Sequence, residues 1–273
     1  MTTLGFRKMH GLGNCFVVVD AIRGRGTAGR DPSALAREAC DRNTGLGADG
    51  LIVLGRSATC DLAMAIYNED GSEAEMCGNG VRCAARYAIE EGLSERRELA
   101  FETRAGTIRT RLVGGDRVEV DMGAPRLESA DVVASGTPPL RVVEGGRAFT
   151  FVSMGNPHAV AFVDDFAFDW RAEGARVESS PSFPNRTNVE FVRIAGPAEA
   201  ELRVWERGCG ETLACGTGAC AVAVAGALEG RLRRGPVTIR LAGGALDVHW
   251  TEAGPVLMTG PAVTICRGEY LFD

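Results

Sequence analysis

The stretch Met76-Cys77-Gly78-Asn79-Gly80-Val81-Arg82-Cys83-Ala84 recurs in altered form as Ala214-Cys215-Gly216-Thr217-Gly218-Ala219-Cys220-Ala221, with Cys215 standing 138 positions after Cys77 (215 − 77). Further pairs share this offset: Glu73 with Glu211, Ile66-Tyr67-Asn68 with Val204-Trp205-Glu206, and Gly106 with Gly244. With a small slip, Gly13-Asn14 corresponds to Gly155-Asn156. Independent recurrence of glycine and cysteine explains any one of these matches. Several of them in the same order predict a duplicated unit within the 273-residue chain.

The residues around the two stretches predict similar halves. After each Cys-Gly pair, the Ala-rich runs 81–91 and 219–229 predict helices that end at Gly92 and Gly230. The second run is so apolar that its helix should be buried. Short strands are expected at 16–20, 51–54, 62–67, 118–122, 149–154, 160–163, 189–194, 202–205, 237–241 and 246–250. The predicted fold is α+β, with two pseudosymmetric lobes, each a mixed β-sheet curved into a barrel around a central helix.

Composition limits the classes of function. The chain has 45% hydrophobic and 24% charged residues, the usual mixture of a globular protein, and a formal charge of −6. This charge argues against a nucleic-acid partner. No apolar run approaches the length of about 20 residues that a membrane helix needs, and no signal peptide is visible at the start. Nine cysteines in a chain of this kind are expected to be reduced thiols, which favours a cytoplasmic location.

The position of Cys77 and Cys215 before the two helices suggests chemistry. Unpaired backbone N–H groups and the positive end of the helix dipole favour a thiolate and are expected to lower the pKa of such a thiol. The following Gly-Xaa-Gly lets a ligand approach the backbone, where the same N–H groups bind a carboxylate. Two such thiols on opposite faces of one α-carbon suit stereochemical inversion: one removes a proton and the other delivers one. Two helix N-termini directed at the substrate carboxylate would stabilise the carbanion, so no cofactor and no metal are expected. The sequence also has no dinucleotide or P-loop fingerprint.

The cysteines also allow other interpretations. A lone cysteine at a helix start is more often a buried, inert residue, but the repeat makes this less attractive for the motif pair. Cys209, Cys215 and Cys220 lack the C-x₂-C spacing of structural zinc sites, and no C-x-x-C redox motif exists. The remaining thiols are assigned to packing or to surface positions: Cys15, Cys40, Cys60, Cys83, Cys209, Cys220 and Cys266.

Four segments resemble the diaminopimelate epimerase family, and the similarity covers essentially the whole chain. They are Lys8-Met9-His10-Gly11-Leu12-Gly13-Asn14, Met76 to Arg82, Met154-Gly155-Asn156-Pro157-His158, and Glu206-Arg207-Gly208-Cys209-Gly210-Glu211-Thr212-Leu213-Ala214-Cys215-Gly216-Thr217-Gly218. The resemblance implies interconversion of the LL and meso forms of 2,6-diaminopimelate, in lysine and peptidoglycan precursor biosynthesis. It also implies a homodimer that needs no cofactor.

By the same resemblance, residues receive roles. Cys77 and Cys215 are the acid–base pair, and His158 and Glu206 match positions important for catalysis. The segments Gly78-Asn79 and Gly216-Thr217 are expected to hold the reacting carboxylate end. Glu206 and Arg207 are expected to bind the distant amino and carboxylate groups, since a zwitterion needs one negative and one positive partner. The expected substrate-binding asparagines are Asn14, Asn68, Asn156 and Asn188.

Each of these residues also has a structural alternative. Glu206 and Arg207 suit an exposed charged pair after a strand, Asn68 and Asn188 suit turns, and His158 suits a satisfied core histidine. Two departures from the family pattern stand out. Cys15 replaces the aspartate that often follows Gly-Leu-Gly-Asn, and Gly50 stands where some members have a substrate-contacting glutamine.

The expected division places residues 1–119 in an N-terminal lobe, joined by a C-terminal strand at about 264–273, and residues 120–263 in a C-terminal lobe. The Pro- and Gly-containing segment 123–139 is the expected crossover, and the active site is expected in the cleft between lobes. Three rival functions were considered: a proline or hydroxyproline racemase, a zinc-binding interaction protein, and a PhzF-like isomerase, which lacks the cysteine pair.

Overall fold

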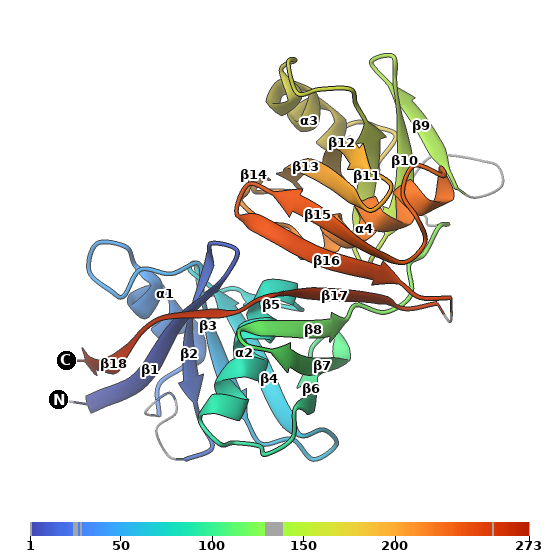
Figure 1. Ribbon diagram of the computed structural model, residues 1–273. Helices are drawn as coiled ribbons and strands as arrows, with labels where there is room; N and C mark the ends of the chain where they lie inside the picture. The colour runs from blue at the N-terminus through green and yellow to red at the C-terminus, as the bar shows by residue number, and fades with distance from the viewer. Residues whose placement is uncertain (1, 24–26, 28, 129–138, 253, 273) are drawn as a thin grey trace. The chain divides into compact units, whose positions relative to one another are not determined.

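The computed structural model describes residues 2–23, 27, 29–128, 139–252 and 254–272. The chain forms two compact units (Figure 1), which divide a few residues away from the expected positions. Unit 1 consists of Met1–Asp121 and Thr259–Asp273, and unit 2 of Met122–Met258. Much of the expected crossover, residues 129–138, lies outside the described residues.

Unit 1 is a mixed sheet in the order β18-β1-β2-β3-β4-β6-β7-β8. Neighbouring strands are antiparallel except for the parallel pairs β2–β3 and β4–β6. The main-chain N–H of Ala262, just before β18, donates to the carbonyl of Asp116, just before β8, over 2.8 Å, and so closes the sheet. The strands are β1 (Thr2–Gly11), β2 (Asn14–Asp20), β3 (Gly50–Gly55), β4 (Leu62–Asn68), β5 (Glu73–Ala74), β6 (Glu98–Thr103), β7 (Gly106–Gly114), β8 (Arg117–Asp121) and β18 (Val263–Phe272).

Two helices cover opposite faces of the strands of unit 1. Helix α2 (Gly78–Glu90) contacts β1, β2, β3, β7 and β8, so the sheet curves around it (Figure 1). Helix α1 (Pro32–Cys40) packs on the other face with Val17, Val19 and Leu51. Because side chains alternate along a strand, Phe16 and Ile52 point to the α2 side.

Unit 2 repeats this plan. Its strands are β9 (Arg141–Glu144), β10 (Arg147–Ser153), β11 (Pro157–Phe162), β12 (Asn188–Gly196), β13 (Glu199–Glu206), β14 (Gly210–Glu211), β15 (Pro236–Leu241) and β16 (Gly244–Trp250), while β17 (Val256–Pro261) runs across the boundary of the units. The sheet order is β9-β10-β11-β12-β13-β15-β16, with parallel pairs β11–β12 and β13–β15. The parallel pairs therefore stand at the same two places as in unit 1.

Helix α4 (Gly216–Leu228) is the counterpart of α2. It contacts β10, β11, β12, β15 and β16, and ten of its residues are buried, as its apolar sequence predicted. Helix α3 (Trp170–Glu178) covers the other face with Phe149, Phe151 and Phe191. The expected α+β fold is confirmed. The chain runs through the order β-β-α-β-β-β-α-β-β-β twice, from β1 to β8 and from β10 to β17, and β18 and β9 are the additional strands of units 1 and 2.

The sequence prediction missed α1 and α3. Both begin after an aspartate whose carboxylate accepts from a backbone N–H three residues on: Asp31 from Ala34 at 2.9 Å and Asp169 from Ala172 at 3.0 Å.

No helix among the described residues is long and apolar enough to cross a membrane.

Candidate active site

Both motif cysteines are N-caps of their helices. Helices α2 and α4 begin at Gly78 and Gly216, three residues before the predicted starts, so Cys77 and Cys215 directly precede them. Each cysteine has extended backbone angles, with φ −140° at Cys77 and −113° at Cys215. The first turn of each helix therefore presents backbone N–H donors beside a thiol.

The predicted residues Cys77, Asn14 and Asn79 meet in unit 1. The Cys77 thiol lies 3.6 Å from the Asn14 side-chain oxygen, which also accepts from Asn79 Nδ2 at 3.3 Å. Asn14 is placed by the turn between β1 and β2, where Leu12 (φ 56°) and Gly13 (φ 86°) take left-handed angles. Such a two-residue turn fits the twist of a β-hairpin.

Two charged residues outside the predicted set hold this cluster. Asp49 accepts from Asn14 Nδ2 at 3.0 Å and from the Cys15 N–H at 2.7 Å. The fully buried Arg82 donates to Asn79 Oδ1 at 2.8 Å and to the carbonyl of Gly78 at 3.1 Å. A Cβ on Gly11 would lie 2.7 Å from Arg82 Nη2, so only glycine leaves room for the guanidinium there.

The remaining predicted residue of unit 1 is less closely tied to the thiol. Asn68 ends β4, and its side chain donates to Ser72 Oγ at 2.9 Å, which is the turn role considered from the sequence. Gly50 lies opposite it on β3, and a Cβ there would approach the carbonyl oxygen of Tyr67 to 2.7 Å. The backbone at position 50 therefore has no room for the glutamine of other family members. The Cys15 thiol donates to the Gly13 carbonyl at 3.3 Å.

In unit 2 the predicted residues form a chain of hydrogen bonds. His158 Nε2 lies 3.0 Å from Asn156 Oδ1, and Asn156 Nδ2 donates to Thr217 Oγ1 at 3.3 Å. Thr217 Oγ1 lies 3.6 Å from the sulfur of Cys215. His158 is on β11 and Thr217 on α4, so the chain joins strand and helix.

The expected lowering of the Cys215 pKa is wrong. Burial raises the pKa of the thiol well above its ordinary value, and the nearby carboxyls of Glu206 and Glu190 raise it further. Hydrogen bonds from Thr217 and from the backbone N–H of Gly218 lower the pKa but do not outweigh these effects. The position of Cys215 at a helix start did not predict the raised pKa, because that position gives no information on burial of the thiol or on the carboxyls of β12 and β13.

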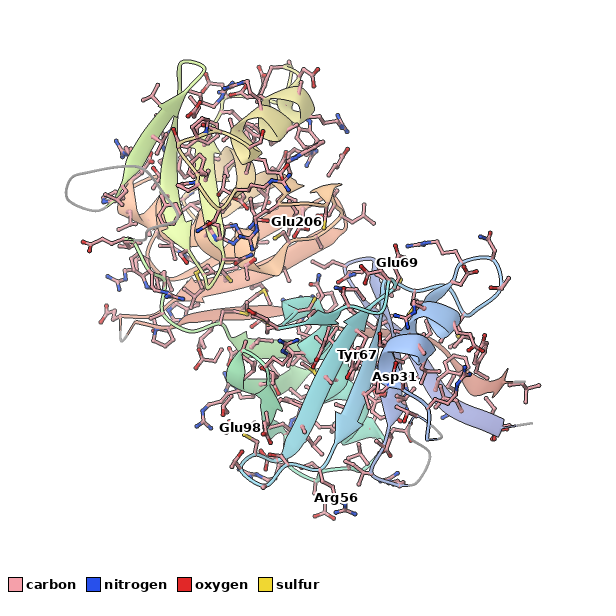
Figure 2. The ribbon with its side chains drawn as sticks, turned by 180° about the vertical axis from the view of Figure 1, so that it is seen from behind. Asp31, Arg56, Tyr67, Glu69, Glu98 and Glu206 are labelled. Atoms are coloured by element: carbon pink, nitrogen blue, oxygen red, sulfur yellow. The ribbon has the colours of Figure 1, made fainter. Side chains whose placement is uncertain are left out.

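Asn188, Glu206 and Arg207 lie around the ends of β12 and β13 in unit 2. Buried Asn188 donates to the Pro157 carbonyl at 2.9 Å and accepts from the backbone N–H of Arg207 at 3.0 Å. Glu206, labelled in Figure 2, ends β13 and accepts from the Thr212 hydroxyl. The Arg207 side chain is exposed and donates to the Asn185 carbonyl at 3.3 Å. An acid and an arginine thus adjoin the asparagine, as a zwitterionic ligand requires.

Glu190 was missed by sequence reasoning, although it is an acid within an apolar strand. Its carboxyl is fully buried, and Oε1 lies 2.7 Å from His158 Nδ1. Burial raises its pKa, the adjacent His158 lowers it, and Glu206 raises it. The lone acid in the Val189–Ile194 run was the available signal.

The other cysteines include core residues. All nine thiols are free, and Cys83 and Cys220 are fully buried, as expected of core residues. Burial raises the pKa of Cys40 and of Cys83 to about 12. Among the described residues, no group of three or more His, Cys, Asp or Glu is arranged to hold a metal ion.

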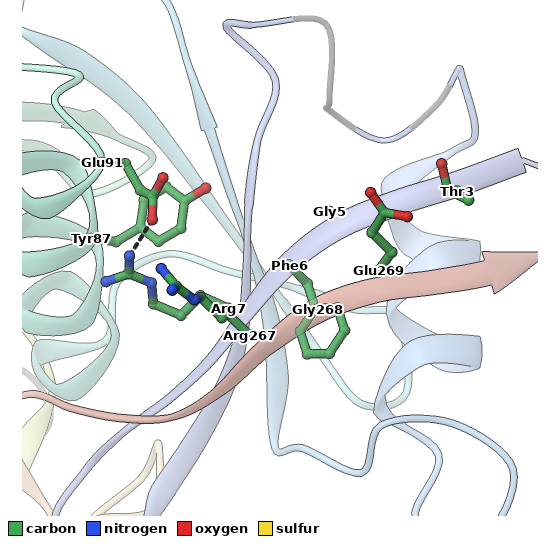
Figure 3. Close-up of a pocket in the computed structure, with 9 residues that line it drawn as sticks. All are labelled: Thr3, Gly5, Phe6, Arg7, Tyr87, Glu91, Arg267, Gly268 and Glu269. Carbon is green, nitrogen blue, oxygen red and sulfur yellow. Dashed lines mark hydrogen bonds and ion pairs between the residues drawn. The ribbon is translucent and has the colours of Figure 1, made fainter.

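A cavity of about 620 Å³ in unit 1 contains no predicted site residue (Figure 3). Arg7, one of the two arginines that line it, is paired with Glu90 and Glu91, and its guanidinium carbon lies 5.3 Å from the centre of the Tyr87 ring. The charge of Arg7 is therefore already neutralised. The lining residues are Thr3, Gly5, Phe6, Arg7, Tyr87, Glu91, Arg267, Gly268 and Glu269.

Solved structures share this fold. A PhzF-family phenazine biosynthesis protein from Bacillus anthracis superposes with a TM-score of 0.72 at 18% identity, covering 100% of both chains. A hydroxyproline epimerase from Agrobacterium vitis gives 0.68 at 16% identity, covering 100% of this chain and 92% of the other. At these identities the likeness concerns the fold alone.

Sequence comparisons go further. The Diaminopimelate epimerase family profile matches residues 6–128 and 150–265. The diaminopimelate epimerase of Desulforudis audaxviator is 52% identical, covering 97% of this chain and 99% of the relative. That of Carboxydothermus hydrogenoformans is 48% identical, covering 97% and 98%. The fold and these similarities define an isomerase of the epimerase class. Within that class, the chain belongs to the diaminopimelate epimerase family.

Proposed function

We propose that the protein interconverts LL- and meso-2,6-diaminopimelate by a two-base reaction of Cys77 and Cys215. The observation that supports this most directly is the equivalence of the two thiols. Each is the N-cap of the corresponding helix in a duplicated unit, and each is followed by a glycine that opens the first turn of the helix. A reaction that moves a proton from one face of a carbon to the other needs two such groups.

In this reaction one thiolate takes the α-proton as the C–H bond breaks. The electron pair is delocalised into the adjoining carboxylate, whose growing charge the helix N–H groups stabilise. The opposite thiol then donates its proton to the other face of the carbon and becomes the thiolate. The reverse reaction exchanges the two roles, so each cysteine acts once as base and once as acid.

The raised pKa of Cys215 is consistent with a resting thiol that donates first or is deprotonated only with substrate bound. Glu206 raises the pKa of this thiol. An ammonium group of the substrate paired with Glu206 would offset that effect and bring the thiol nearer to ionisation. Gly78, Asn79, Gly216 and Thr217 would bind the reacting carboxylate, and Asn14, Asn68, Asn156 and Asn188 would contribute neutral hydrogen bonds.

At the distal end, Glu206 and Arg207 would bind one amino and one carboxylate group. Arg207 is exposed, so its guanidinium is accessible for a bidentate contact with a carboxylate. A cyclic amino acid such as proline has no second amino-acid end for this pair. The 52% and 48% identical relatives also favour diaminopimelate over a ring substrate.

We further propose that the enzyme works in the cytoplasm as a homodimer without cofactor, metal, nucleic-acid or membrane partner. Nine free thiols suit a reducing compartment, and the charge of −6 does not suit nucleic acid. Sedimentation at micromolar concentration measures the assembly state, and a monomer there would contradict the dimer.

Exchange of the α-proton in D₂O, followed by NMR, tests the reaction. Reduced wild-type protein should interconvert LL- and meso-diaminopimelate with incorporation of deuterium, whereas Cys77→Ala and Cys215→Ala should each abolish epimerisation. Exchange of proline or hydroxyproline instead would make the substrate assignment wrong. No exchange with any amino acid would return the two cysteines to a structural role.

A further inference from the structure

The two units differ at one pair of equivalent positions beneath the cysteine helices. In the parallel pair β2–β3, Phe16 lies opposite Gly50, and in β11–β12, His158 lies opposite Asn188. Two residues further along the second strand, unit 1 has Ile52 and unit 2 has Glu190. The matched register makes Phe16 and Ile52 the counterparts of His158 and Glu190.

The helix glycines support the same equivalence. A Cβ on Gly80 of α2 would lie 3.3 Å from Ile52 Cδ1 and 3.5 Å from Phe16 Cζ. A Cβ on Gly218 of α4 would lie 2.8 Å from Glu190 Oε1 and 3.3 Å from the sulfur of Cys215. Helix α2 therefore rests on two apolar side chains, whereas α4 rests on an ionisable pair that is immediately beside the thiol.

Burial of this ionisable pair stabilises the fold less than an apolar pair at the same place would. His158 and Glu190 both have 0% exposed side chains, and Glu190 Oε2 is buried without a hydrogen-bond partner among the described residues. Unfavourable desolvation makes a buried ion pair a poor source of stability compared with well-packed apolar residues. Unit 1 has the apolar residues Phe16 and Ile52 at the equivalent positions of the same fold. Stability alone therefore does not explain why unit 2 has His158 and Glu190 there.

The contacts of His158 fix how many protons the pair carries. Nδ1 faces the Glu190 carboxyl at 2.7 Å and Nε2 faces the Asn156 oxygen at 3.0 Å. Nε2 must then donate, and the proton between Nδ1 and Oε1 belongs either to the ring or to the carboxyl. Both forms hold two protons and have no net charge, which suits a site without exposed surface.

The donor directions continue from this pair to the thiol. Nε2–H donates to Asn156 Oδ1, Asn156 Nδ2 donates to Thr217 Oγ1, and the Thr217 hydroxyl is then left to donate to the sulfur, 3.6 Å away. Aligned hydrogen bonds of this kind polarise one another.

We propose that Glu190 is a positioning residue of the epimerase: it holds His158 with Nε2–H directed at Asn156, and thereby directs the Thr217 hydroxyl to Cys215. The inference rests on the proposed function. The carboxyls of Glu206 and Glu190 raise the pKa of Cys215. The Glu206 carboxyl also raises the pKa of Glu190, and the His158 ring lowers it. Glu190 does not touch the substrate in this scheme, and it acts on the Cys215 half of the reaction.

Two variants separate the effect of the acidic proton of Glu190 from the effect of its size. Glu190→Gln keeps the size and a hydrogen-bonding group but carries no exchangeable acidic proton. Glu190→Ile reproduces the residue that unit 1 has at this place. The matched control is Glu144→Gln. It alters a different carboxyl of unit 2, which is partly buried and accepts from the Ser180 and Ser182 hydroxyls at 2.5 Å.

The first readout needs no substrate. The chain has three histidines, so ¹⁵N-histidine labelling gives few signals, and loss of one in His158→Gln assigns His158. Wild type should show both ring nitrogens of His158 hydrogen-bonded. In Glu190→Ile the Nδ1 signal should move to that of a nitrogen without a hydrogen bond, while Glu144→Gln should match wild type. Unchanged His158 signals in Glu190→Ile would overturn the positioning role.

The second readout is catalysis of diaminopimelate epimerisation. Glu190→Gln should lower kcat by about tenfold or more, as loss of a carboxylate that orients a histidine commonly does, with KM changed less than about threefold. Glu190→Ile should lose more, and the pH profile of kcat/KM should shift in Glu190→Gln. Folded variants with altered His158 signals but wild-type kcat and pH profile would overturn the proposal. If wild type itself lacks epimerase activity, the proposed function fails, and this assay identifies that failure separately from the NMR result.

Discussion

At the scale of single residues, the glycine that follows each motif cysteine by three positions gives a matched pair of tests. We expect Gly218→Ala to reduce epimerase activity by about 100-fold, because its Cβ would meet Glu190 Oε1 at 2.8 Å and displace the Cys215 thiol by a fraction of an ångström or more. Overpacking should also lower the free energy of unfolding by about 1–3 kcal/mol.

The control is Gly80→Ala in unit 1. There the added Cβ meets the ends of Ile52 and Ile66 at 3.3 Å, and such side chains can yield. We expect a smaller loss of activity and stability, measured by the same kinetics and by urea unfolding. Equal losses in the two variants would show that the ionisable pair under Cys215 has no special consequence.

The raised pKa of Cys215 gives a pH prediction. Glu206 raises this pKa, so Glu206→Gln should lower it and increase the thiolate fraction at any given pH. The rate of iodoacetamide alkylation at Cys215, followed by peptide mass spectrometry, should then rise at lower pH than in wild type. Glu211→Gln is the control, since Glu211 is exposed and paired with Arg171 at 2.6 Å. An unchanged alkylation profile in Glu206→Gln would contradict the carboxyl's effect.

The raised pKa of Cys215 also makes the stability of the folded protein depend on pH. A thiol in the unfolded chain ionises near pH 8.5, whereas folded Cys215 keeps its proton to higher pH. Its contribution to stability is therefore full below about pH 8.5 and declines as the pH rises from there towards the folded pKa.

Sequence alone identified Cys77 and Cys215 as candidate acid–base residues but not the residues that surround them. The repeat selected Cys77 and Cys215 from nine thiols, because equivalent positions have equivalent places in a duplicated fold. Asp49 and Glu190 were missed because their roles depend on which strands become neighbours. The register His158 opposite Asn188 joins segments about 30 positions apart, and no local pattern specifies it.

At the scale of elements, Arg82 connects helix α2 to its surroundings. Its guanidinium donates to Gly78, to Asn79 and, at 3.1 Å, to the Pro261 carbonyl. Arg82→Met keeps an apolar stem but removes these donors, and each buried acceptor left unsatisfied costs about 1–3 kcal/mol. We expect a loss of at least about 3 kcal/mol, measured by urea unfolding with far-UV circular dichroism.

Arg86→Met is the control for this variant, because Arg86 is on the same helix but is partly exposed, with 19% of its side chain accessible. It should lose less stability than Arg82→Met. A loss below about 1 kcal/mol in Arg82→Met would show that water replaces the donors and that α2 does not depend on them.

Elements with a strong apolar or Ala-rich pattern were predictable, and those with a weak one were not. The apolar or Ala-rich composition predicted helices α2 and α4 and the buried strands, because one face or all faces of each element lie against the core. Helices α1 and α3 have nine residues each and bury only part of their surface, so their pattern is short. The aspartate caps at Asp31 and Asp169 were the local signal for both.

At the scale of the whole molecule, unit 1 depends on a strand from the far end of the chain. Strand β18 pairs with β1 from Thr2↔Phe272 to His10↔Val263. Truncation after Pro261 would leave β1 with an unpaired edge and expose its buried residues. We expect hydrogen exchange in β1 and β2 to become fast, while α4 and β12 keep most of their protection.

Fluorescence offers a second check of this truncation. All three tryptophans, Trp170, Trp205 and Trp250, belong to unit 2. Their emission should stay close to wild type in buffer, even as circular dichroism shows loss of structure from unit 1. Simultaneous loss of both signals would show that the two units unfold as one.

The internal duplication also has a consequence for how the ends of a substrate are told apart. Asn68-Glu69 of unit 1 corresponds to Glu206-Arg207 of unit 2 at the offset of 138. A half-length ancestor acting as a pair of identical chains would have had the same residues on both sides. In a single chain the two halves can differ, and here Asn68-Glu69 stands where the other half has the acid–arginine pair. Diaminopimelate has two chemically alike ends, and unlike halves give a protein different groups with which to bind each of them.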